Sequence, residues 1–305
     1  MPDQIIEIMT PGTSLQKNRG FIEVSNDTGF VGRVAIDDAL AIIIGTPGCS
    51  VSTNLLDVLS TSNIPIVICG NNYNPSSITL PLVGHSRQFV VMNHQAKVSE
   101  PRRKRAWQQL VRAKISAQNE VLNRAGRPAD RMLHLIGRVR SGDPDNIEAQ
   151  AARIYWRALF GSDFRRDRDQ VGVNSSLNYA YAVLRACVAR ALCASGLHPS
   201  FSLHHRNARN PLNLADDLIE PLRPIADYLI FLHEEEFSTE LAIRSKQKLA
   251  SLVNIRTRTS EGLTPLSLAT VKMCRSLADY YAGEIDTIST PLLPRELDYN
   301  DTQPL

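Results

Sequence analysis

The sequence lacks any long, uninterrupted apolar run. No stretch of roughly 18 residues is free of charged or polar side chains, so no transmembrane helix is expected. The first ten residues, MPDQIIEIMT, hold two acids and no basic residue, so they do not resemble a secretory signal peptide. We therefore expect a cytoplasmic protein with no membrane association.

Cysteine pairs are also missing. The five cysteines are scattered and odd in number, and no two of them form a CxxC pair. This spacing argues against a structural zinc site and against a disulfide framework. Free, buried thiols are the expected state of Cys49, Cys69, Cys187, Cys193 and Cys274.

The composition is that of a globular protein, and its positive charge lies in one segment. Hydrophobic residues make up 43% of the 305 residues, enough for two domains with a core each. Residues 1–96 hold four Lys/Arg against seven Asp/Glu, whereas residues 97–140 hold twelve against three. Such a local excess is expected where a polyanion binds.

The N-terminal quarter of the chain is typical of β structure. Short apolar runs at 21–24, 30–36, 39–44 and 64–69 are separated by turn-prone residues. Ser52 is placed to cap a short helix between the last two runs.

From about Pro101 the apolar spacing becomes helical. The clearest helix is expected over 174–195, where an apolar stripe ends at Gly196. Further helices are expected at 148–159, 213–220, 239–253 and 264–282. We predict an α+β fold with a small N-terminal β-rich domain (1–72), a connector (73–96), a larger all-α catalytic domain (97–286) and a disordered tail (287–305).

Three places in the helical part could hold a divalent metal, which phosphodiester chemistry usually needs. Mg²⁺ prefers carboxylate oxygens, and Mn²⁺ also accepts imidazole. Glu148 opens a helix, although a first-turn glutamate alone is more often explained by the helix dipole. A histidine pair such as His204 and His205 is more often structural. Asp216, Asp217 and Glu220 share one helix face, which requires either a bound cation or a solvated helix end.

The order and spacing of these pieces are more specific than any one of them. Together they resemble the CRISPR-associated spacer-acquisition integrase family, in the branch that accompanies type II systems. The resemblance covers nearly the whole chain to about Leu277, with Ser202 and Leu222 replacing an expected glycine and phenylalanine. The motifs that carry it are Gly196-x-x-Pro199, His204-His205-Arg206-Asn207, Asn213-Leu-Ala-Asp-Asp-Leu and Asp217-Leu218-x-Glu220-x-x-Arg223-Pro224.

The resemblance implies a metal site and a reaction. Glu148, His205 and Glu220 would be catalytic metal ligands for Mg²⁺ or Mn²⁺. Asp217 would be a further ligand or would support one, and His204 would orient a neighbour or contact DNA. The 3′-hydroxyl of a captured DNA fragment would attack the backbone of a CRISPR repeat, and water in its place would give endonuclease activity.

The basic segment supplies candidates for a DNA-facing surface, although a solvated helix face would have the same composition. Arginine and lysine contacts to phosphates suit a duplex that is held without being read. The candidates are Arg102, Arg103, Lys104, Arg105, Arg112 and Lys114.

Two other functions are compatible with parts of the sequence. A non-catalytic DNA-binding scaffold of the same acquisition complex would keep the basic segment but would not require the three ligand types. A nucleotide phosphohydrolase would need an adjacent His-Asp pair, which is absent.

The resemblance also implies partners. They are double-stranded DNA, a second copy of the chain held through the β domain, and a small ferredoxin-like protein whose dimer is flanked by two dimers of this chain. The RNA-guided effector nuclease of type II systems would take part in choosing fragments.

Overall fold

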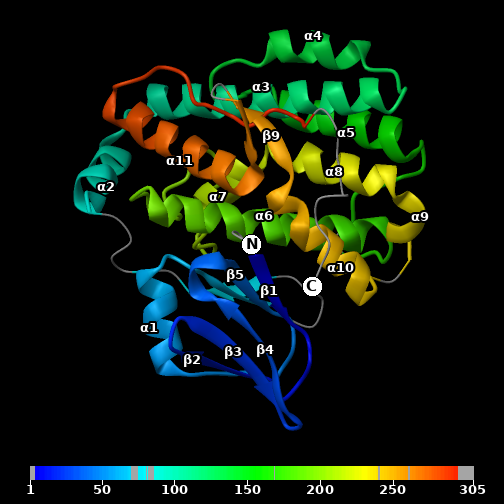
Figure 1. Ribbon diagram of the computed structural model, residues 1–305. Coiled ribbons are helices and arrows are strands. Elements are labelled where there is room, and N and C mark those ends of the chain that lie inside the picture. The colour runs from blue at the N-terminus through cyan, green and yellow to red at the C-terminus, as the bar shows by residue number, and fades with distance from the viewer. Residues whose placement is uncertain are drawn as a thin grey trace.

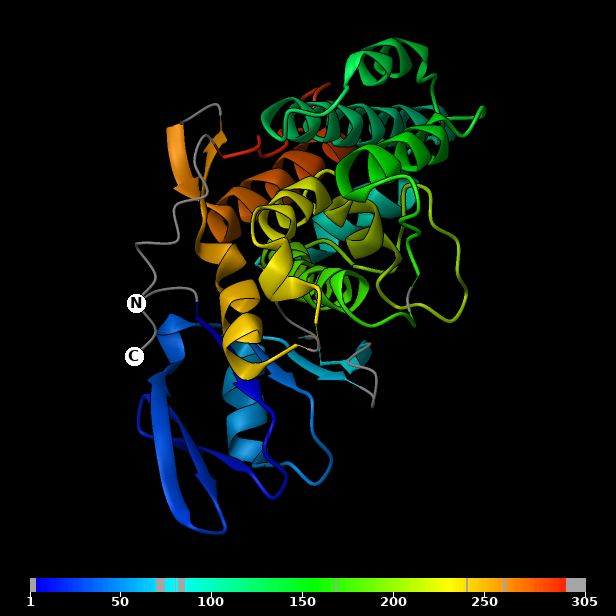
Figure 2. The ribbon, with the colours of Figure 1, turned by 90° about the vertical axis from the view of Figure 1, so that its right-hand side faces the viewer.

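The computed structural model describes residues 4–69, 75–79, 81, 86–167, 169–239, 241–259 and 262–294. A small β-rich domain lies below a larger helical domain in Figure 1, and the view turned by 90° in Figure 2 shows the same two layers. The α+β fold predicted from the sequence is confirmed.

The first sheet of the β domain has the strand order β1-β5-β7-β8. Strands β1, β5 and β7 are parallel, and β8 pairs antiparallel with β7. All six residues of β5 are buried, because a central parallel strand is covered on both faces and must be apolar throughout. The strands are β1 Gln4–Ile8, β5 Ala39–Ile44, β7 Ile66–Cys69 and β8 Pro75–Ile78.

The second sheet has the order β4-β3-β2-β6 and shares a core with the first sheet. Leu15 and Ile22 from this sheet join Ile42 from β5 and Leu55 from α1 in that core. The Ser52 side chain accepts a hydrogen bond from the Leu55 N–H and so caps α1, as predicted. The elements are β2 Ser14–Asn18, β3 Phe21–Asn26, β4 Gly29–Ala35, β6 Ser50–Val51 and α1 Thr53–Thr61.

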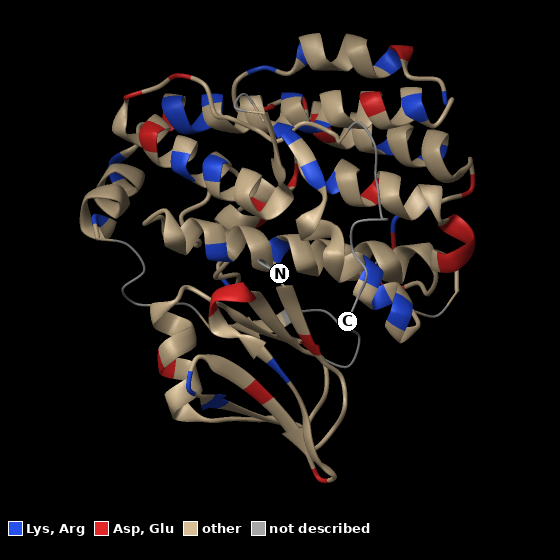
Figure 3. Cartoon of the chain, viewed as in Figure 1, with Lys and Arg blue, Asp and Glu red and all other residues tan. Residues whose placement is uncertain are grey.

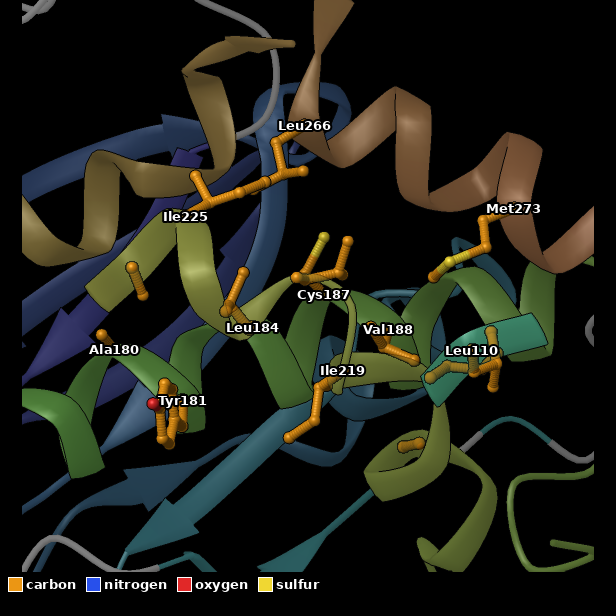
Figure 4. Close-up of a cluster of buried hydrophobic side chains, with 14 of the residues drawn as sticks. Leu110, Ala180, Tyr181, Leu184, Cys187, Val188, Ile219, Ile225, Leu266 and Met273 are labelled. Atoms are coloured by element: carbon orange, nitrogen blue, oxygen red, sulfur yellow. The ribbon is translucent and has the colours of Figure 1, made fainter. Parts of the chain in front are cut away.

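The helical domain is built around α6, which is buried on nearly every side. Its side chains Leu184, Cys187 and Val188 lie in a cluster with Leu110 of α3 and Met273 of α11 (Figure 4). A helix surrounded in this way must be apolar over most of its circumference. The helices are α3 Glu100–Arg124, α4 Asp130–Arg138, α5 Ile147–Phe160, α6 Val173–Ala194, α7 Asn213–Ile219, α8 Arg223–Leu232, α9 Glu234–Phe237, α10 Ile243–Ala250 and α11 Leu266–Ala282.

The chain also forms elements that the sequence did not predict. The segment expected as a connector contributes β8 to the first sheet and also forms α2 (Gln88–Lys97), which packs against α11. The helical domain contains an antiparallel hairpin of β9 (Arg256–Thr259) and β10 (Gly262–Pro265). None of the five cysteines forms a disulfide bond, as expected, and three of the five are buried.

The prediction of a disordered tail from residue 287 is wrong for residues 287–294. Ile288 is 4% exposed and Leu293 is 2% exposed, so both belong to the main core. The Gln109 side chain accepts a hydrogen bond from the Ile288 N–H at 2.8 Å. Although this segment contains prolines, the burial of Ile288 and Leu293 and the hydrogen bond to Gln109 of α3 hold it against the helical domain. The rest of the predicted tail, 295–305, lies outside the described residues.

Across the described ranges, no helix is long and apolar enough to cross a membrane.

Candidate active site

Two of the three predicted ligands converge on one buried ammonium group. The Lys114 Nζ lies 2.6 Å from Oε1 of Glu148 and 2.5 Å from Oε2 of Glu220. Lys114 is only 7% exposed. The expectation that Lys114 faces DNA is therefore wrong. Its positive charge is needed inside, where an unpaired carboxylate would be strongly destabilising.

Side chains that cap the N-terminus of α5 fix the position of Glu148. The Asp143 carboxylate accepts hydrogen bonds from the N–H groups of Ile147 and Glu148 at 2.9 and 3.0 Å. The Asn146 side chain accepts a third from Ala149 at 3.3 Å. These caps satisfy N–H groups that have no partner within the helix. They also fix the backbone of Glu148, so that its side chain reaches Lys114 on α3.

Glu220 lies at the junction of α7 and α8, and its carboxylate is engaged on both oxygens. Oε1 lies 3.1 Å from the Arg223 guanidinium, and Oε2 receives Lys114. Burial opposes ionisation of Glu220, but the charges of Arg223 and Lys114 outweigh it and hold its pKa at about 2. Glu220 is therefore ionised at neutral pH although it is buried.

Asp217 organises the loop that carries the histidines. One of its oxygens accepts the N–H groups of Leu203 and His204, at 2.6 and 3.1 Å. The other accepts the His205 N–H at 3.1 Å and lies 2.7 Å from the Nδ1 atom of the His205 ring. The hydrogen bond to Asp217 raises the pKa of His205, against the opposing effect of burial. With Nδ1 bound in this way, Nε2 is the nitrogen that can bind a ligand.

Trp107 supports the histidine pair from α3. Its indole stacks on the His204 ring with centroids 4.4 Å apart, and it meets the His205 ring edge-on at 5.8 Å. Trp107 is 1% exposed. From the sequence alone, Trp107 is only an apolar position of a helix. Trp107 and Lys114 are seven residues apart and therefore lie on one face of α3, and this spacing is the signal that could have identified Trp107 as a residue of the site.

Glu148, Glu220 and His205 offer the ligand atoms that a hard divalent cation binds, but they do not surround a common position. In the described part of the chain, no group of three or more His, Cys, Asp or Glu side chains is arranged to hold a metal ion. The carboxylates of Glu148 and Glu220 already share one cation, Lys114. The negative charges of both also raise the pKa of the His205 ring, which Asp217 holds in place. Carboxylate oxygens with one imidazole suit Mg²⁺ or Mn²⁺.

The remaining DNA-facing candidates have different environments. The Arg102 guanidinium donates to the carbonyl oxygen of Tyr280 at 2.8 Å and pairs with Asp286, so it holds α11 and the segment after it. Lys104 pairs with Glu100 on the surface of α3. Figure 3 shows basic residues spread along α3 and α11. Contact with DNA stays a prediction for Arg103, Lys104, Arg105 and Arg112.

A cavity of about 920 Å³ opens beside His205, between the two domains. Its walls include Ser76 and Ser77 of the β domain and Asn178 of α6. Arg206 and Arg209 are exposed at its rim. No pattern in the sequence indicated this cavity, because its walls come from segments about 100 residues apart. The arginines that line it are Arg166, Arg185, Arg206, Arg209 and Arg223.

Comparison with known proteins agrees with the fold. The chain is 40% identical over 240 residues to the CRISPR-associated endonuclease Cas1 of Neisseria meningitidis serogroup C (strain 8013), covering 77% of this chain and 78% of that protein. A casposase bound to an integration product shares the fold, with a TM-score of 0.76, 17% identity and coverage of 100% and 96%. A chain of a Cas6-RT-Cas1–Cas2 complex does so with a TM-score of 0.73, 14% identity and coverage of 93% and 35%.

The fold together with the 40% identical relative places the chain in the class of CRISPR-associated endonucleases and integrases of spacer acquisition. The family described as CRISPR-associated protein Cas1 matches residues 6–240. The chain belongs to the Cas1 family and is an endonuclease and integrase of spacer acquisition.

Proposed function

We propose that Glu148, His205 and Glu220 hold the divalent metal ion with which this Cas1 enzyme cuts and joins DNA. The observation that carries the proposal is that both carboxylates meet at one cation, within electrostatic range of His205. A bound Mg²⁺ or Mn²⁺ would supply positive charge for the scissile phosphate.

The protein's own residues have separate tasks in this proposal. Glu148 and Glu220 provide anionic oxygens, and burial of Glu220 keeps one of them away from water. Asp217 holds the Nδ1 side of His205 and so orients Nε2, as supporting carboxylates do in other metal sites. Asp217 acts through His205, since its oxygens are already engaged by several N–H groups.

The reaction is a transesterification. The 3′-hydroxyl oxygen of a captured fragment bonds to a phosphorus of the repeat, and the bond from that phosphorus to its original 3′-oxygen breaks. The proton leaves the attacking hydroxyl and a proton is taken up by the released 3′-oxygen. One phosphodiester replaces another, so no energy-supplying cofactor is needed. Water as the attacking group gives cleavage.

We further propose that the arginine-lined cavity beside His205 receives the DNA strand whose end reacts. Exposed guanidinium groups at its rim can bind phosphates without reading bases. The similar casposase is described as bound to an integration product, which supports DNA as the ligand of this fold.

The proposed partners follow from the same relatives. A similar chain is part of a complex that contains Cas2, which supports a small Cas2-type partner here. Phe30 and Val31 of β4 are 67% and 59% exposed, which suits a homodimer contact through the β domain. Sedimentation that shows only monomer at micromolar concentration would oppose this dimer.

The form of the histidine motif supports the type II branch, with its effector nuclease as a further partner.

The test is strand transfer of a short duplex into a supercoiled plasmid that carries a CRISPR repeat, with Mn²⁺ or Mg²⁺ and the small partner protein. Glu148→Ala, His205→Ala and Glu220→Ala should each abolish joining while DNA binding is kept. Glu100→Ala, which removes an exposed carboxylate of α3, is the matched control and should join normally. Normal joining by the three variants would show that the site is misplaced. Binding without any joining by the wild type would favour the scaffold alternative.

A further inference from the structure

We propose that Lys114 is an internal cation that occupies the proposed metal site until the metal arrives, and that metal binding must displace it from the two carboxylates. This inference rests on the proposed metal site. Lys114 then has a role of its own, as the cation that competes with the metal for the proposed ligands.

The geometry shows that the ammonium group and a metal compete for the same space. One nitrogen lies within hydrogen-bond distance of Oε1 of Glu148 and Oε2 of Glu220, so these oxygens are at most about 5 Å apart. A Mg²⁺ ion about 2.1 Å from each oxygen would require them to lie about 3 to 4 Å apart. A metal between them would therefore stand where the ammonium stands now.

Glu220 has no unused oxygen that would avoid this competition. The second oxygen of Glu220 is already bound by Arg223. Glu220 is 2% exposed, so its carboxylate has no solvent-facing side on which to take a second cation. A metal that binds Glu220 must therefore replace Lys114 or Arg223 at one of the Glu220 oxygens. Of these two basic residues, Lys114 is the one that also pairs with Glu148.

The charges explain why the displacement matters for affinity. Lys114 and Arg223 carry two positive charges, which match the two negative charges of Glu148 and Glu220. A divalent ion thus approaches carboxylates that are already neutralised. Removing the charge of Lys114 would leave a net negative site, and at these short distances one charge changes affinity by a large factor.

An acceptor for the displaced ammonium lies one helical turn away. Gln118 is four residues from Lys114, so the two share a face of α3. Its Oε1 atom is buried and accepts no hydrogen bond from the described residues. A buried carbonyl oxygen of this kind is stabilised by a donor.

The experiment is a Mn²⁺ titration of the full-length protein, followed by calorimetry, together with thermal unfolding. Lys114→Met should bind Mn²⁺ at least about tenfold more tightly than wild type. Without metal it should unfold several degrees lower, because two carboxylates lose their cation, and saturating Mn²⁺ should close that gap. Lys104→Met, the same change at an exposed ion pair of α3, should alter neither quantity.

A purely structural role for Lys114 predicts the opposite sign, since a disturbed site binds metal more weakly. Equal or weaker Mn²⁺ binding by Lys114→Met overturns the inference. If that variant does not fold without metal, Lys114→Gln takes its place with the same expected direction. Glu148→Ala and Glu220→Ala, titrated alongside, test the metal site itself. If they keep wild-type affinity, the proposed function fails, whereas loss in these two with no gain at Lys114 overturns only the lysine inference.

Discussion

Asp217 shows how much one buried residue can determine at this site. Its carboxylate is fully buried and gathers three backbone N–H groups and a histidine ring nitrogen from the loop before α7. Without it, these donors would lack acceptors inside the protein. The position of His205 is therefore set by Asp217 and by the stacking of its neighbour His204 on Trp107.

Asp217→Asn should reduce strand transfer by about 10- to 100-fold, the usual cost of removing a carboxylate that supports a metal-binding histidine. The amide nitrogen of asparagine would face an N–H group and lose part of the network. Glu236→Gln, at a carboxylate that pairs with Lys248 away from the site, is the control for a general effect on the fold. Strand transfer and the melting temperature should be measured on both. Full activity in Asp217→Asn would contradict the assigned role.

Asp227 makes the stability of the helical domain depend on pH. It is 1% exposed, and burial raises its pKa to about 7, although a hydrogen bond from the Tyr181 hydroxyl at 2.5 Å opposes the rise. The folded protein therefore keeps this proton up to about pH 7, whereas the unfolded chain releases it near 3.8. Stability should fall as pH rises from about 4 to 7, by up to a few kcal/mol.

Asp227→Asn should remove this dependence, because the amide stays neutral and its oxygen can still accept the Tyr181 hydroxyl. The melting temperature of the wild type should drop more than that of the variant between pH 5 and pH 8. Parallel pH profiles for the two proteins would show that Asp227 does not carry the proton.

At the scale of elements, α3 joins the site to the C-terminal segment. One part of it bears Trp107 and Lys114, and its first turns hold the chain that follows α11. There the Arg102 side chain donates to carbonyl oxygens of Tyr280 and Ile285, and its guanidinium lies 4.2 Å from the centre of the Tyr280 ring. α3 can contact both the site and the C-terminal segment because side chains on different turns and faces of one helix point towards different neighbours.

Arg102→Met should loosen the segment after α11, since it removes the hydrogen bonds while keeping most of the apolar stem. Amide hydrogen exchange over residues 284–293 should become faster. Lys104→Met is the matched control and should leave exchange unchanged. A loss of DNA affinity with no change in exchange would instead return Arg102 to the predicted DNA-facing surface.

At the scale of the whole molecule, the cavity beside His205 exists only because the two domains pack together. Val67 and Ile78 of the first sheet line it together with Ala182 and Arg185 of α6. The basic segment 97–140, by contrast, is partly used inside the protein, through Lys114 and Arg102. The number of positive charges therefore overstates the DNA-facing surface of α3.

Arg206→Ala and Arg209→Ala together should weaken binding of duplex fragments. The slope of log affinity against log salt should fall by about one for each phosphate that the double variant no longer binds. Fluorescence anisotropy at several salt concentrations measures both quantities. Arg153→Ala, an arginine on the exposed side of α5, serves as the control for total charge. An unchanged salt slope in the double variant would place the DNA elsewhere.

The sequence by itself determined the α+β order and a long helix expected over 174–195, which the structure has at Val173–Ala194, because periodicity and helix ends are local properties of the chain. The choice of Glu148, His205, Asp217 and Glu220 as candidates came from the resemblance to a family that the motifs around them carry. Only the tertiary structure decided that Lys114 joins residues 34 and 106 positions away, and that Trp107 stacks on a histidine. It also decided that residues 287–294 pack into the core. Local patterns show which side chains are charged or apolar, but which of them meet depends on contacts between distant segments that form only when the whole chain packs.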